Sequence, residues 1–516
     1  MWFSTLLPFV TLALTFTSSA SAQDFDIGEL ERKPLVTSAA LQRRIHRDNL
    51  LRHARNFQHF AEQTSKTTPN RAFGSVGHNS TVRYIKKLLD ATKFYDTQLQ
   101  TFPYTYAEAS SNFTANGVIL PTKSLFYGIS GDVTAPLFAT GNLGCVPEHF
   151  PASVEGKLVL IQRGDCIYGI KVALAGAAKA AGVIIFNDVP AELSGGSLGG
   201  VSRPEGPYVP VGTISGTAGL DLQARLAAGE EITGVLKAYG LVEERYSSNL
   251  IATSKQGNKN QIVFSGSHSD SVPGGPGIND DGSGTMGNLE TALQLTNFRL
   301  NNAVRFGWWT AEEFGLVGST HHIRNLPQSE RDKIALYLNF DMIASPNSGF
   351  FIYDGDGDTF QRPGPPGSAQ IEKLYEDYYK AKGLISRPSN FTGRSDYGPF
   401  LEVGIPCGGV FTGHEGVKTD EGVQWWGGQA GVVYDPCYHA RCDTYENLRV
   451  ETFETNVKAI AHSIAVYSMS LETIPFPRAA SSISSRSADE KLHVETLTYE
   501  ERRHYGCDHA HEVSWQ

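Results

Sequence analysis

Three hydrophobic runs in the second half of the chain each lead into side chains that can bind metal ions or carry protons. The runs cover residues 261–264, 304–309 and 334–340, and the polar residues that follow them are His268 and Asp270, Glu312 and Glu313, and Asp341. In doubly wound α/β folds the ligand site lies at the carboxyl ends of the strands. Imidazoles and carboxylates bind divalent metals and also transfer protons. The pattern therefore predicts a metal-dependent catalytic site at that edge of a sheet.

Two further segments extend this set of donors. Asp280 lies in a glycine-rich acidic turn before a predicted helix, and His439 follows Tyr438 much later in the chain. Asp270 stands two residues after His268, on the same side of an extended segment, so it can orient the imidazole. Two histidines and three carboxylates can hold two divalent ions if one carboxylate bridges them. One glutamate then remains as a proton carrier.

The elements that must position these residues follow an α/β pattern. Residues 241–475 alternate strands and helices, and their near-continuous apolar runs are typical of strands covered on both faces. Met286, Leu289 and Leu293 fall on one face of a helix. We predict a mostly parallel central sheet flanked by helices. Residues 38–116 form the first part of this domain and residues 241–475 the second part. In the first part we predict a helix from Ser38 to Phe60. One face of this helix is apolar and contains Leu41, Ile45, Leu51, Phe57 and Phe60.

Residues 117–240 differ in composition and predict a separate inserted domain. They are rich in Gly, Val and Ala, with a strand predicted at 157–161, a helix at 170–181 and a strand at 183–186. After residue 475 the chain becomes Ser-rich and then charged, which predicts a disordered tail over 476–516.

The first residues have the pattern of a secretory signal. Leu6 to Phe16 are an apolar stretch, and Ala20-Ser21-Ala22 is a cleavage pattern, so residues 1–22 are a predicted signal peptide and part of 23–37 a candidate propeptide. Three sequons, at Asn79, Asn112 and Asn390, are predicted glycosylation sites. We predict secretion; delivery to a vacuole begins with the same signal and stays open.

Composition excludes several function classes. The chain of 516 residues has 44 basic and 54 acidic side chains, a net charge of −10, and no Lys/Arg-rich run of the kind that nucleic-acid binding requires. No stretch after the leader is long and apolar enough for a membrane span. We therefore expect neither a nucleic acid nor a membrane as partner. We also expect a monomer, although composition does not determine the oligomeric state.

The six cysteines are too few for a disulfide scaffold but suffice for a few local bridges. Cys437 and Cys442 enclose four residues, and we predict a disulfide between them. The pairing of Cys145, Cys166, Cys407 and Cys507 stays open.

The motifs together resemble the co-catalytic di-zinc aminopeptidases of the aminopeptidase Y type, over roughly residues 38–475. They are Gly-Ser-His-Ser-Asp-Ser at 266–271, Gly-Ile-Asn-Asp-Asp-Gly-Ser-Gly at 277–284 and Trp-Thr-Ala-Glu-Glu-Phe-Gly-Leu-Val-Gly-Ser at 309–319. Residues 117–240 resemble a protease-associated domain, which such enzymes carry as an insert. The resemblance implies a zinc exopeptidase fold and removal of the N-terminal residue from peptides with a free N-terminus, with a broad or Leu-like preference.

The resemblance also implies a role for each site residue. The five metal ligands would be His268 and Asp341 on one zinc, Glu313 and His439 on the other, and Asp280 as the bridge. Glu312 would be the general base, Asp270 the support of His268, and Tyr438 the donor to the developing oxyanion. Arg394 would lie on the substrate side. The peptide bond between Asp280 and Asp281 would be cis.

Alternative functions stay open at this point. They are a related di-zinc carboxypeptidase, a single-zinc glutaminyl-cyclase-like enzyme and an inactive receptor-like ectodomain on the same scaffold. Separately, Asp354, Asp356 and Asp358 resemble the start of an EF-hand loop, but Pro365 stands where that loop needs Glu. A calcium site of another kind stays open there.

Overall fold

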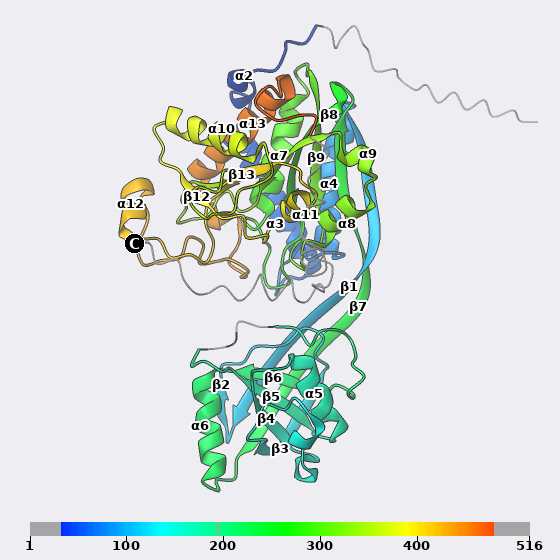
Figure 1. Ribbon diagram of the computed structural model, residues 1–516, viewed down its shortest axis with the longest axis vertical. Coiled ribbons are helices and arrows are strands. Elements are labelled where there is room, and N and C mark those ends of the chain that lie inside the picture. Colours follow the sequence, from blue (N-terminus) through cyan, green and yellow to red (C-terminus); the bar gives the residue numbers. More distant parts are fainter. Residues whose placement is uncertain (1–31, 192, 194–195, 479–516) are drawn as a thin grey trace, which may run out of the picture.

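A computed structural model describes residues 32–191, 193 and 196–478, which form two lobes joined by a two-stranded ribbon (Figure 1). The ribbon consists of β1 (Tyr95–Ala115) and β7 (Thr233–Ser254). These strands pair antiparallel along their length, with Tyr95 opposite Ser254 and Ala115 opposite Gly234. The large lobe contains the N-terminal helices and the chain after β7, and the inserted lobe contains the chain between β1 and β7.

The sheet of the large lobe has a parallel centre and antiparallel edges. Its strand order is β12-β11-β13-β10-β8-β9-β7, and β1 pairs with β7. The four strands β13, β10, β8 and β9 are parallel to one another, whereas β11 and β7 run antiparallel to their inner neighbours. The strands are β8 (Asn258–His268), β9 (Asn302–Trp309), β10 (Ile334–Phe340), β11 (Phe351–Tyr353), β12 (Arg387–Ser389) and β13 (Cys407–Phe411). The predicted mostly parallel sheet is confirmed, and β8, β9 and β10 are the three predicted strands.

Successive side chains of these strands enter two different buried clusters. Val263 and Trp308 belong to the cluster on one face, and Phe264 and Trp309 to the cluster on the other. This alternation follows from the two-residue period of a strand. Trp309 Nε1 donates to the Tyr337 hydroxyl at 2.8 Å, so the indole keeps a hydrogen bond in the core. Both faces are therefore covered, as the continuous apolar runs predict.

Helices supply both covers. The first cluster packs under α2, α3, α4, α7, α10 and α13, and the second under α8 and α11. The helices of the large lobe are α2 (Ser38–Gln42), α3 (Arg47–Thr64), α4 (Val76–Thr92), α7 (Gly282–Leu295), α8 (Val317–Asn325), α9 (Gln328–Arg331), α10 (Ser368–Ala381), α11 (Gly398–Glu402), α12 (Asp420–Trp426), η3 (Tyr445–Asn447) and α13 (Val450–Met469).

The single helix predicted from Ser38 to Phe60 is wrong in two details. The segment forms two helices, α2 and α3, with a break after Gln42. After this break the helical phase changes, so Leu50 and not Leu51 enters the core.

The inserted lobe repeats the two-sided architecture on a smaller scale. Its strands β3, β4, β5 and β6 are parallel, and β3 runs antiparallel to β7. Val159 and Val183 pack on the α5 side, and Leu158 and Ile184 on the α6 side. The elements are β2 (Val118–Leu120), β3 (Gly131–Ala139), η1 (Pro147–His149), η2 (Ala152–Val154), β4 (Leu158–Gln162), α5 (Tyr168–Ala177), β5 (Gly182–Phe186), β6 (Val211–Ile214) and α6 (Gly216–Ala227). The predicted strand–helix–strand unit is β4, α5 and β5.

The boundary between the lobes lies inside continuous strands. Ala107, Phe113 and Ala115 are buried in the clusters of the inserted lobe, although they precede the predicted boundary after residue 116. Tyr106 and Leu241 instead pack with side chains of the large lobe. The chain therefore enters the inserted lobe earlier than predicted, and it leaves close to the predicted residue 241.

At the other end, Phe476 packs on the large core and Arg478 Nη2 donates to the Arg331 carbonyl at 2.8 Å. Residues 476–478, predicted as part of the tail, thus belong to the large lobe. The predicted signal peptide, most of the candidate propeptide and residues 479–516 lie outside the described residues.

The described residues contain two disulfides, one in each lobe. Cys437 pairs with Cys442 as predicted, and Cys145 pairs with Cys166. Cys407 is buried and forms no disulfide within the described residues, and Cys507 lies outside them.

The three sequons lie in different environments. Asn112 is exposed on β1. Asn79 is half-buried within α4, and its side-chain amide donates to the Gly74 carbonyl at 3.3 Å. The side-chain oxygen of Asn390 is buried. Asn112 is therefore the sequon that offers the most accessible amide for glycosylation.

Within the described part of the chain, no helix combines the length and apolar character that crossing a membrane requires.

Candidate active site

Five of the predicted residues converge at the carboxyl ends of β8, β9 and β10. His268 Nε2 lies 3.2 Å from Asp280 Oδ1 and 3.6 Å from Asp341 Oδ1. His439 Nε2 lies 3.1 Å from Asp280 Oδ2 and 3.0 Å from Glu313 Oε2. The carboxylate of Asp280 therefore stands between the two imidazoles, with one oxygen toward each.

Asp270 connects His268 with Glu312, the predicted general base. Asp270 Oδ1 lies 3.6 Å from His268 Nδ1 and accepts the backbone N–H of Glu312 at 3.2 Å. Glu312 Oε2 lies 3.9 Å from His268 Nε2, so its carboxylate faces the same space as the donors. One buried carboxylate thus fixes both an imidazole and the segment that carries Glu312.

The Asp280–Asp281 peptide bond is cis, as the resemblance implies. Asp281 is the N-cap of α7, where its Oδ1 accepts from Gly284 N at 2.8 Å, and its Oδ2 accepts from His268 N at 3.1 Å. Its oxygens are therefore used by the main chain, whereas those of Asp280 face the imidazoles. A Cβ on Gly284 would lie 1.9 Å from the Phe340 carbonyl oxygen, so only glycine lets α7 begin this close to β10.

Two buried aspartates hold the turn before Asp280. Asp443 accepts the backbone N–H groups of Asn279 and Asp280 at 2.9 and 3.0 Å. Asp435 accepts the side-chain amide of Asn279 at 2.6 Å. The disulfide Cys437–Cys442 lies between these aspartates in the chain. The segment that supplies His439 therefore also clamps the turn that supplies Asp280.

Left-handed backbone conformations gather beside the site residues. Ala311, Met342 and His439 have φ of 53°, 52° and 55°. Ala311 precedes Glu312, and Met342 follows Asp341. Such conformations are unfavourable for residues with a Cβ and concentrate at functional sites.

Two residues from the N-terminal part of the chain support the site, and no sequence pattern predicted either of them. Arg71 is fully buried, and it donates to the carbonyls of Ser269 at 2.6 Å, Pro276 at 2.9 Å and Gly277. Burial lowers the pKa of Arg71 to about 10, opposed by Asp270 and Asp443, so the guanidinium is charged at neutral pH. His78 Nε2 lies 2.9 Å from Ser269 Oγ, and burial lowers the pKa of His78 to about 4.

The segment after Gly393 has a supporting role on the Asp341 side. Ser395 Oγ donates to Asp341 Oδ2 at 2.6 Å. Asp396 is 1% exposed, and burial raises its pKa to about 7. Arg394, the predicted substrate-side residue, forms an ion pair with Glu415 at 3.3 Å rather than with the five converging donors. Ser395 and Asp396 were not predicted.

Tyr438 lies against both an imidazole donor and a neighbouring histidine. Its ring stacks on His439 with centroids 3.8 Å apart and on His414 with centroids 5.1 Å apart. Burial raises the pKa of Tyr438 well above its ordinary value, and the charges of Asp280 and Glu313 raise it further. Its hydroxyl therefore keeps its proton and can donate a hydrogen bond.

The electrostatics of the site show an excess of carboxylates. Burial lowers the pKa of His268, but Asp341 and Glu312 outweigh this effect and the pKa is raised well above its ordinary value. Burial also raises the pKa of Glu312 strongly, and the charges of Asp396 and Asp341 add to it. A bound cation would relieve this repulsion between carboxylates.

The donor atoms fit divalent metal ions. Ligand atoms of His268, Asp280 and Glu313 lie within 4.8 Å of one another, and so do those of His268, Asp281 and Asp341. Nitrogen and carboxylate oxygen are the donors that zinc accepts in proteins. Because main-chain groups use both oxygens of Asp281, the carboxylates left for metal are Asp280, Glu313 and Asp341.

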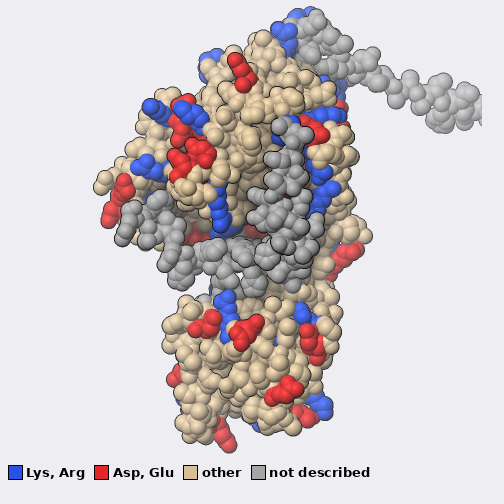
Figure 2. All heavy atoms as spheres, in the orientation of Figure 1, with Lys and Arg blue, Asp and Glu red and all other residues tan. Residues whose placement is uncertain are grey.

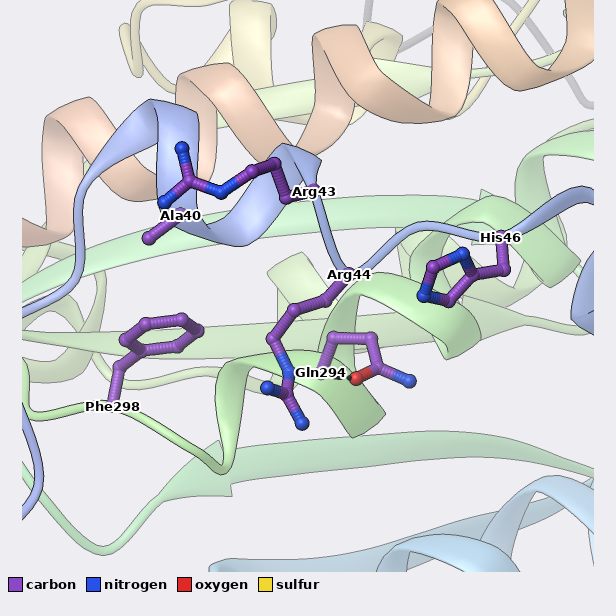
Figure 3. A pocket seen from close by; sticks show the side chains of 6 residues that line it. All are labelled: Ala40, Arg43, Arg44, His46, Gln294 and Phe298. Carbon is purple, nitrogen blue, oxygen red and sulfur yellow. Dashed lines mark hydrogen bonds between the residues drawn. The ribbon is translucent and has the colours of Figure 1, made fainter.

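The open space near these donors is narrow. The crevice beside them is lined by Val272, Gly275, Gly277, Asp280, Glu313, His439, Ala440 and Asp443. A larger cavity of about 510 Å³ lies elsewhere, between α2 and α7, where Arg44 Nε donates to Gln294 Oε1 at 3.0 Å (Figure 3). It is lined by Ala40, Arg43, Arg44, His46, Gln294 and Phe298, none of which is a predicted site residue.

The fold and the site together define a class. A doubly covered parallel sheet carries imidazoles and carboxylates at its carboxyl edge, with Glu312 left over beside them. This is the arrangement of a hydrolase that activates water with divalent metal.

Comparisons with known proteins agree with this class. Residues 249–464 match the model of peptidase family M28, and residues 133–222 match the PA domain. The chain is 44% identical over 444 residues to leucine aminopeptidase 2 of Arthroderma otae, covering 86% of this chain and 88% of that relative. It is 43% identical over 483 residues to a probable leucine aminopeptidase 2 of Aspergillus fumigatus, covering 93% and 95%. The chain belongs to peptidase family M28 and is an aminopeptidase.

Solved structures have the same fold. An aminopeptidase from Aneurinibacillus sp. strain AM-1 matches with a TM-score of 0.62 and 26% identity, over 84% of this chain and 95% of that one. BSAP, a zinc aminopeptidase from Bacillus subtilis, matches with a TM-score of 0.57 and 24% identity, over 81% and 95%. The predicted family, the fold and the protease-associated insert are thus confirmed.

Proposed function

We propose that this chain is a secreted di-zinc aminopeptidase that removes an N-terminal residue, with a Leu-like preference, from peptides with a free N-terminus. The observation that carries the two-metal assignment is the position of Asp280. One of its oxygens lies 3.2 Å from His268 Nε2 and the other 3.1 Å from His439 Nε2. A carboxylate placed between two imidazoles can bridge two ions.

Each ion would have its own protein ligands beside this bridge. His268 and Asp341 would hold one zinc, and Glu313 and His439 the other. Ser395 and the backbone N–H of Val272 donate to Asp341 and Glu313 at 2.6 and 3.1 Å and fix their carboxylates. Zinc, when bound, supplies a Lewis acid that lowers the pKa of water and polarises the scissile carbonyl.

Glu312 moves the proton in the proposed reaction. Its carboxylate faces the donors, and its segment is fixed through Asp270. Burial raises the pKa of Glu312, so it accepts a proton from water more readily than an exposed glutamate. It then returns that proton to the leaving amine. Tyr438 keeps its own proton and donates a hydrogen bond to the carbonyl oxygen as negative charge develops there.

The acidic surroundings also favour a substrate with a free α-ammonium group. The carboxylates of Glu312 and Asp341 face the donor cluster and carry the charge that such a group needs. The Leu-like preference is supported by the names of the two relatives, which are leucine aminopeptidase 2 and probable leucine aminopeptidase 2.

A matched set of blocked dipeptides tests the reaction. Leu-Gly amide should be hydrolysed, and N-acetyl-Leu-Gly should not. Cleavage of the N-acetyl substrate with its free carboxylate would instead indicate the carboxypeptidase alternative. Lys-Gly amide and Leu-Gly amide, compared at equal concentration, test the side-chain preference.

Secretion is supported by the leader pattern and by a disulfide in each lobe. Expression of the full chain in a eukaryotic secretory host should give protein in the medium that lacks residues 1–22. Retention of Met1 in an intracellular product would contradict this proposal.

A further inference from the structure

A second group of carboxylates lies apart from the catalytic donors, at the junction of β11 and α10. Asp354 directly follows β11, Asp356 follows two residues later, and Glu372 lies in α10. Their carboxylates each offer an oxygen within 4.8 Å of the other two. Asp354 and Glu372 are buried, whereas Asp356 is exposed. The group is therefore closed on the protein side and open to solvent at Asp356.

The hydrogen bonds of this group leave one buried oxygen without a partner. Asp354 is 1% exposed; its Oδ2 accepts from Phe360 N at 2.8 Å, but its Oδ1 has no hydrogen-bond partner among the described residues. Glu372 Oε2 accepts the backbone N–H groups of Gly355 and Asp356 at 2.8 and 3.1 Å. The main chain thus fixes both buried carboxylates while Asp354 keeps a free acceptor.

Positive side chains do not balance this cluster. Across residues 32–191, 193 and 196–478, no Lys, Arg or His forms an ion pair with Asp354, Asp356 or Glu372. Figure 2 shows acidic side chains gathered on the visible face over α10, with basic ones beside them. Like charges this close repel one another strongly when partly removed from water. Either a cation or a proton must relieve that repulsion.

We propose that Asp354, Asp356 and Glu372 form a calcium site, separate from the catalytic metal site. All three side chains offer oxygen, which calcium prefers, and calcium takes up to eight oxygen ligands, including water. The exposed side of the cluster leaves room for such waters. An open site of this kind resembles extracellular calcium modules, which bind in the range of about 10⁻⁴–10⁻³ M.

The ion would connect β11 and the loop after it with α10. Asp354 N donates to the Ser389 carbonyl of β12 at 2.8 Å, so the site lies beside the strand that leads to Arg394 and Ser395. Calcium would link β11 and its loop to α10 by bonds that the protein alone does not make. We therefore expect calcium to stabilise the large lobe without replacing the catalytic metal.

The alternative to a cation is a protonated carboxylate. Burial raises the pKa of Glu372 to about 7, and the charges of Asp356 and Asp354 contribute to the increase. At pH 8 Glu372 is mostly ionised, so a proton no longer relieves the repulsion. If the cluster is not a calcium site, calcium will have no effect on the protein even at this pH.

Calorimetric titration of calcium chloride into the zinc-loaded full chain at pH 8 tests the proposal. The wild type should bind one calcium and its unfolding midpoint should rise by about 2–4 °C at saturation. Asp354→Asn and Glu372→Gln should lose both effects. Their amides can still accept the same backbone hydrogen bonds, so both variants should fold and keep their zinc. Without calcium they should be at least as stable as the wild type, because each removes one repelling charge.

Asp377→Asn is the matched control, since Asp377 is an exposed carboxylate on the same helix that pairs with Lys373. It should bind calcium like the wild type. Absence of calcium binding by the wild type at 10 mM (about ten times the weakest expected Kd), or unchanged binding in both variants, would overturn the proposal. Magnesium binding as tight as calcium binding would overturn the choice of ion.

Discussion

The two lobes use the same architecture, but the polar residues at their strand ends differ. In both, parallel strands bury alternate side chains under helices on two faces. At the strand ends of the large lobe, buried carboxylates and imidazoles face one another. In the inserted lobe the buried Lys171 donates to the Gly164 carbonyl at 2.8 Å, and Asn187 donates to the Ala191 carbonyl at 3.2 Å. There the polar groups stabilise loops.

This difference indicates that the proposed catalytic site depends on particular residues and not on the βαβ arrangement. In the described part of the chain, the groups of acidic, His or Cys side chains that could hold a metal all lie in the large lobe. Burying such a cluster is costly. A second set of side chains, including Arg71 and Asp443, holds it together.

The largest expected effect tests the bridge in the large lobe. Asp280→Ala removes the carboxylate shared by both imidazoles, so zinc content should fall below one per chain and hydrolysis of Leu-Gly amide should decrease by more than ~10⁴-fold, the upper range for loss of a general base. Metal analysis and initial rates are the measurements. Asp188→Ala, an exposed carboxylate at the end of β5 in the inserted lobe, is the control and should retain both properties. Normal zinc content in Asp280→Ala would contradict the bridging role.

The next effect separates metal binding from proton transfer. Glu312→Gln preserves the shape of the side chain but cannot accept a proton, so kcat should fall ~10²–10⁴-fold while both zinc ions remain. Glu330→Gln, on α9 at the surface, should behave like the wild type. Full activity of Glu312→Gln would remove Glu312 from the mechanism.

A smaller effect is expected from the buried support of the large lobe. Arg71→Met keeps most of the volume but leaves the carbonyls of Ser269, Pro276 and Gly277 without a donor. We expect a decrease of roughly 3 kcal/mol in the free energy of unfolding and a ~10–100-fold weaker zinc affinity. Denaturant unfolding and zinc titration measure the two effects. The exposed Arg43→Met is the control, and an unchanged zinc affinity in Arg71→Met would show that Arg71 stabilises the fold alone.

The smallest effects are expected from removal of the two disulfides, one of which lies in each lobe. Loop length predicts about 2 kcal/mol of stabilisation for Cys437–Cys442, with a separation of 5 residues, and about 3 kcal/mol for Cys145–Cys166, with a separation of 21. Replacing the first pair with serine should weaken zinc binding and activity, because it releases the loop of His439. Replacing the second pair should cost more stability but leave kcat/KM unchanged. The opposite pattern would show that the bridge in the inserted lobe, and not the one beside His439, supports the site.

Sequence patterns predicted the parts of the site that are local in the chain. His268 and Asp270, or Glu312 and Glu313, are neighbours at the end of an apolar run, so their positions follow from the strands. The Cys437–Cys442 bridge is equally local. The lobe boundary within β1 could not be predicted from the sequence, because one continuous strand contributes to both cores.

The supporting residues could not be predicted, because their contacts join distant segments. Arg71 meets the carbonyl of Ser269 across 198 residues, and Asp443 meets Asp280 N across 163. A buried arginine in an N-terminal loop has no pattern in the sequence that separates it from an exposed one. Leu51 was wrongly predicted as a core residue in place of Leu50, because the break after α2 changes the helical phase.

Whether Asp280 joins two zinc ions in one site can be determined from the zinc content of the purified full chain. Plasma emission spectroscopy, with protein concentration from amino-acid analysis, should give two zinc ions per chain after removal of loosely bound metal by gel filtration. One zinc per chain or fewer in a fully active preparation would contradict the two-zinc site.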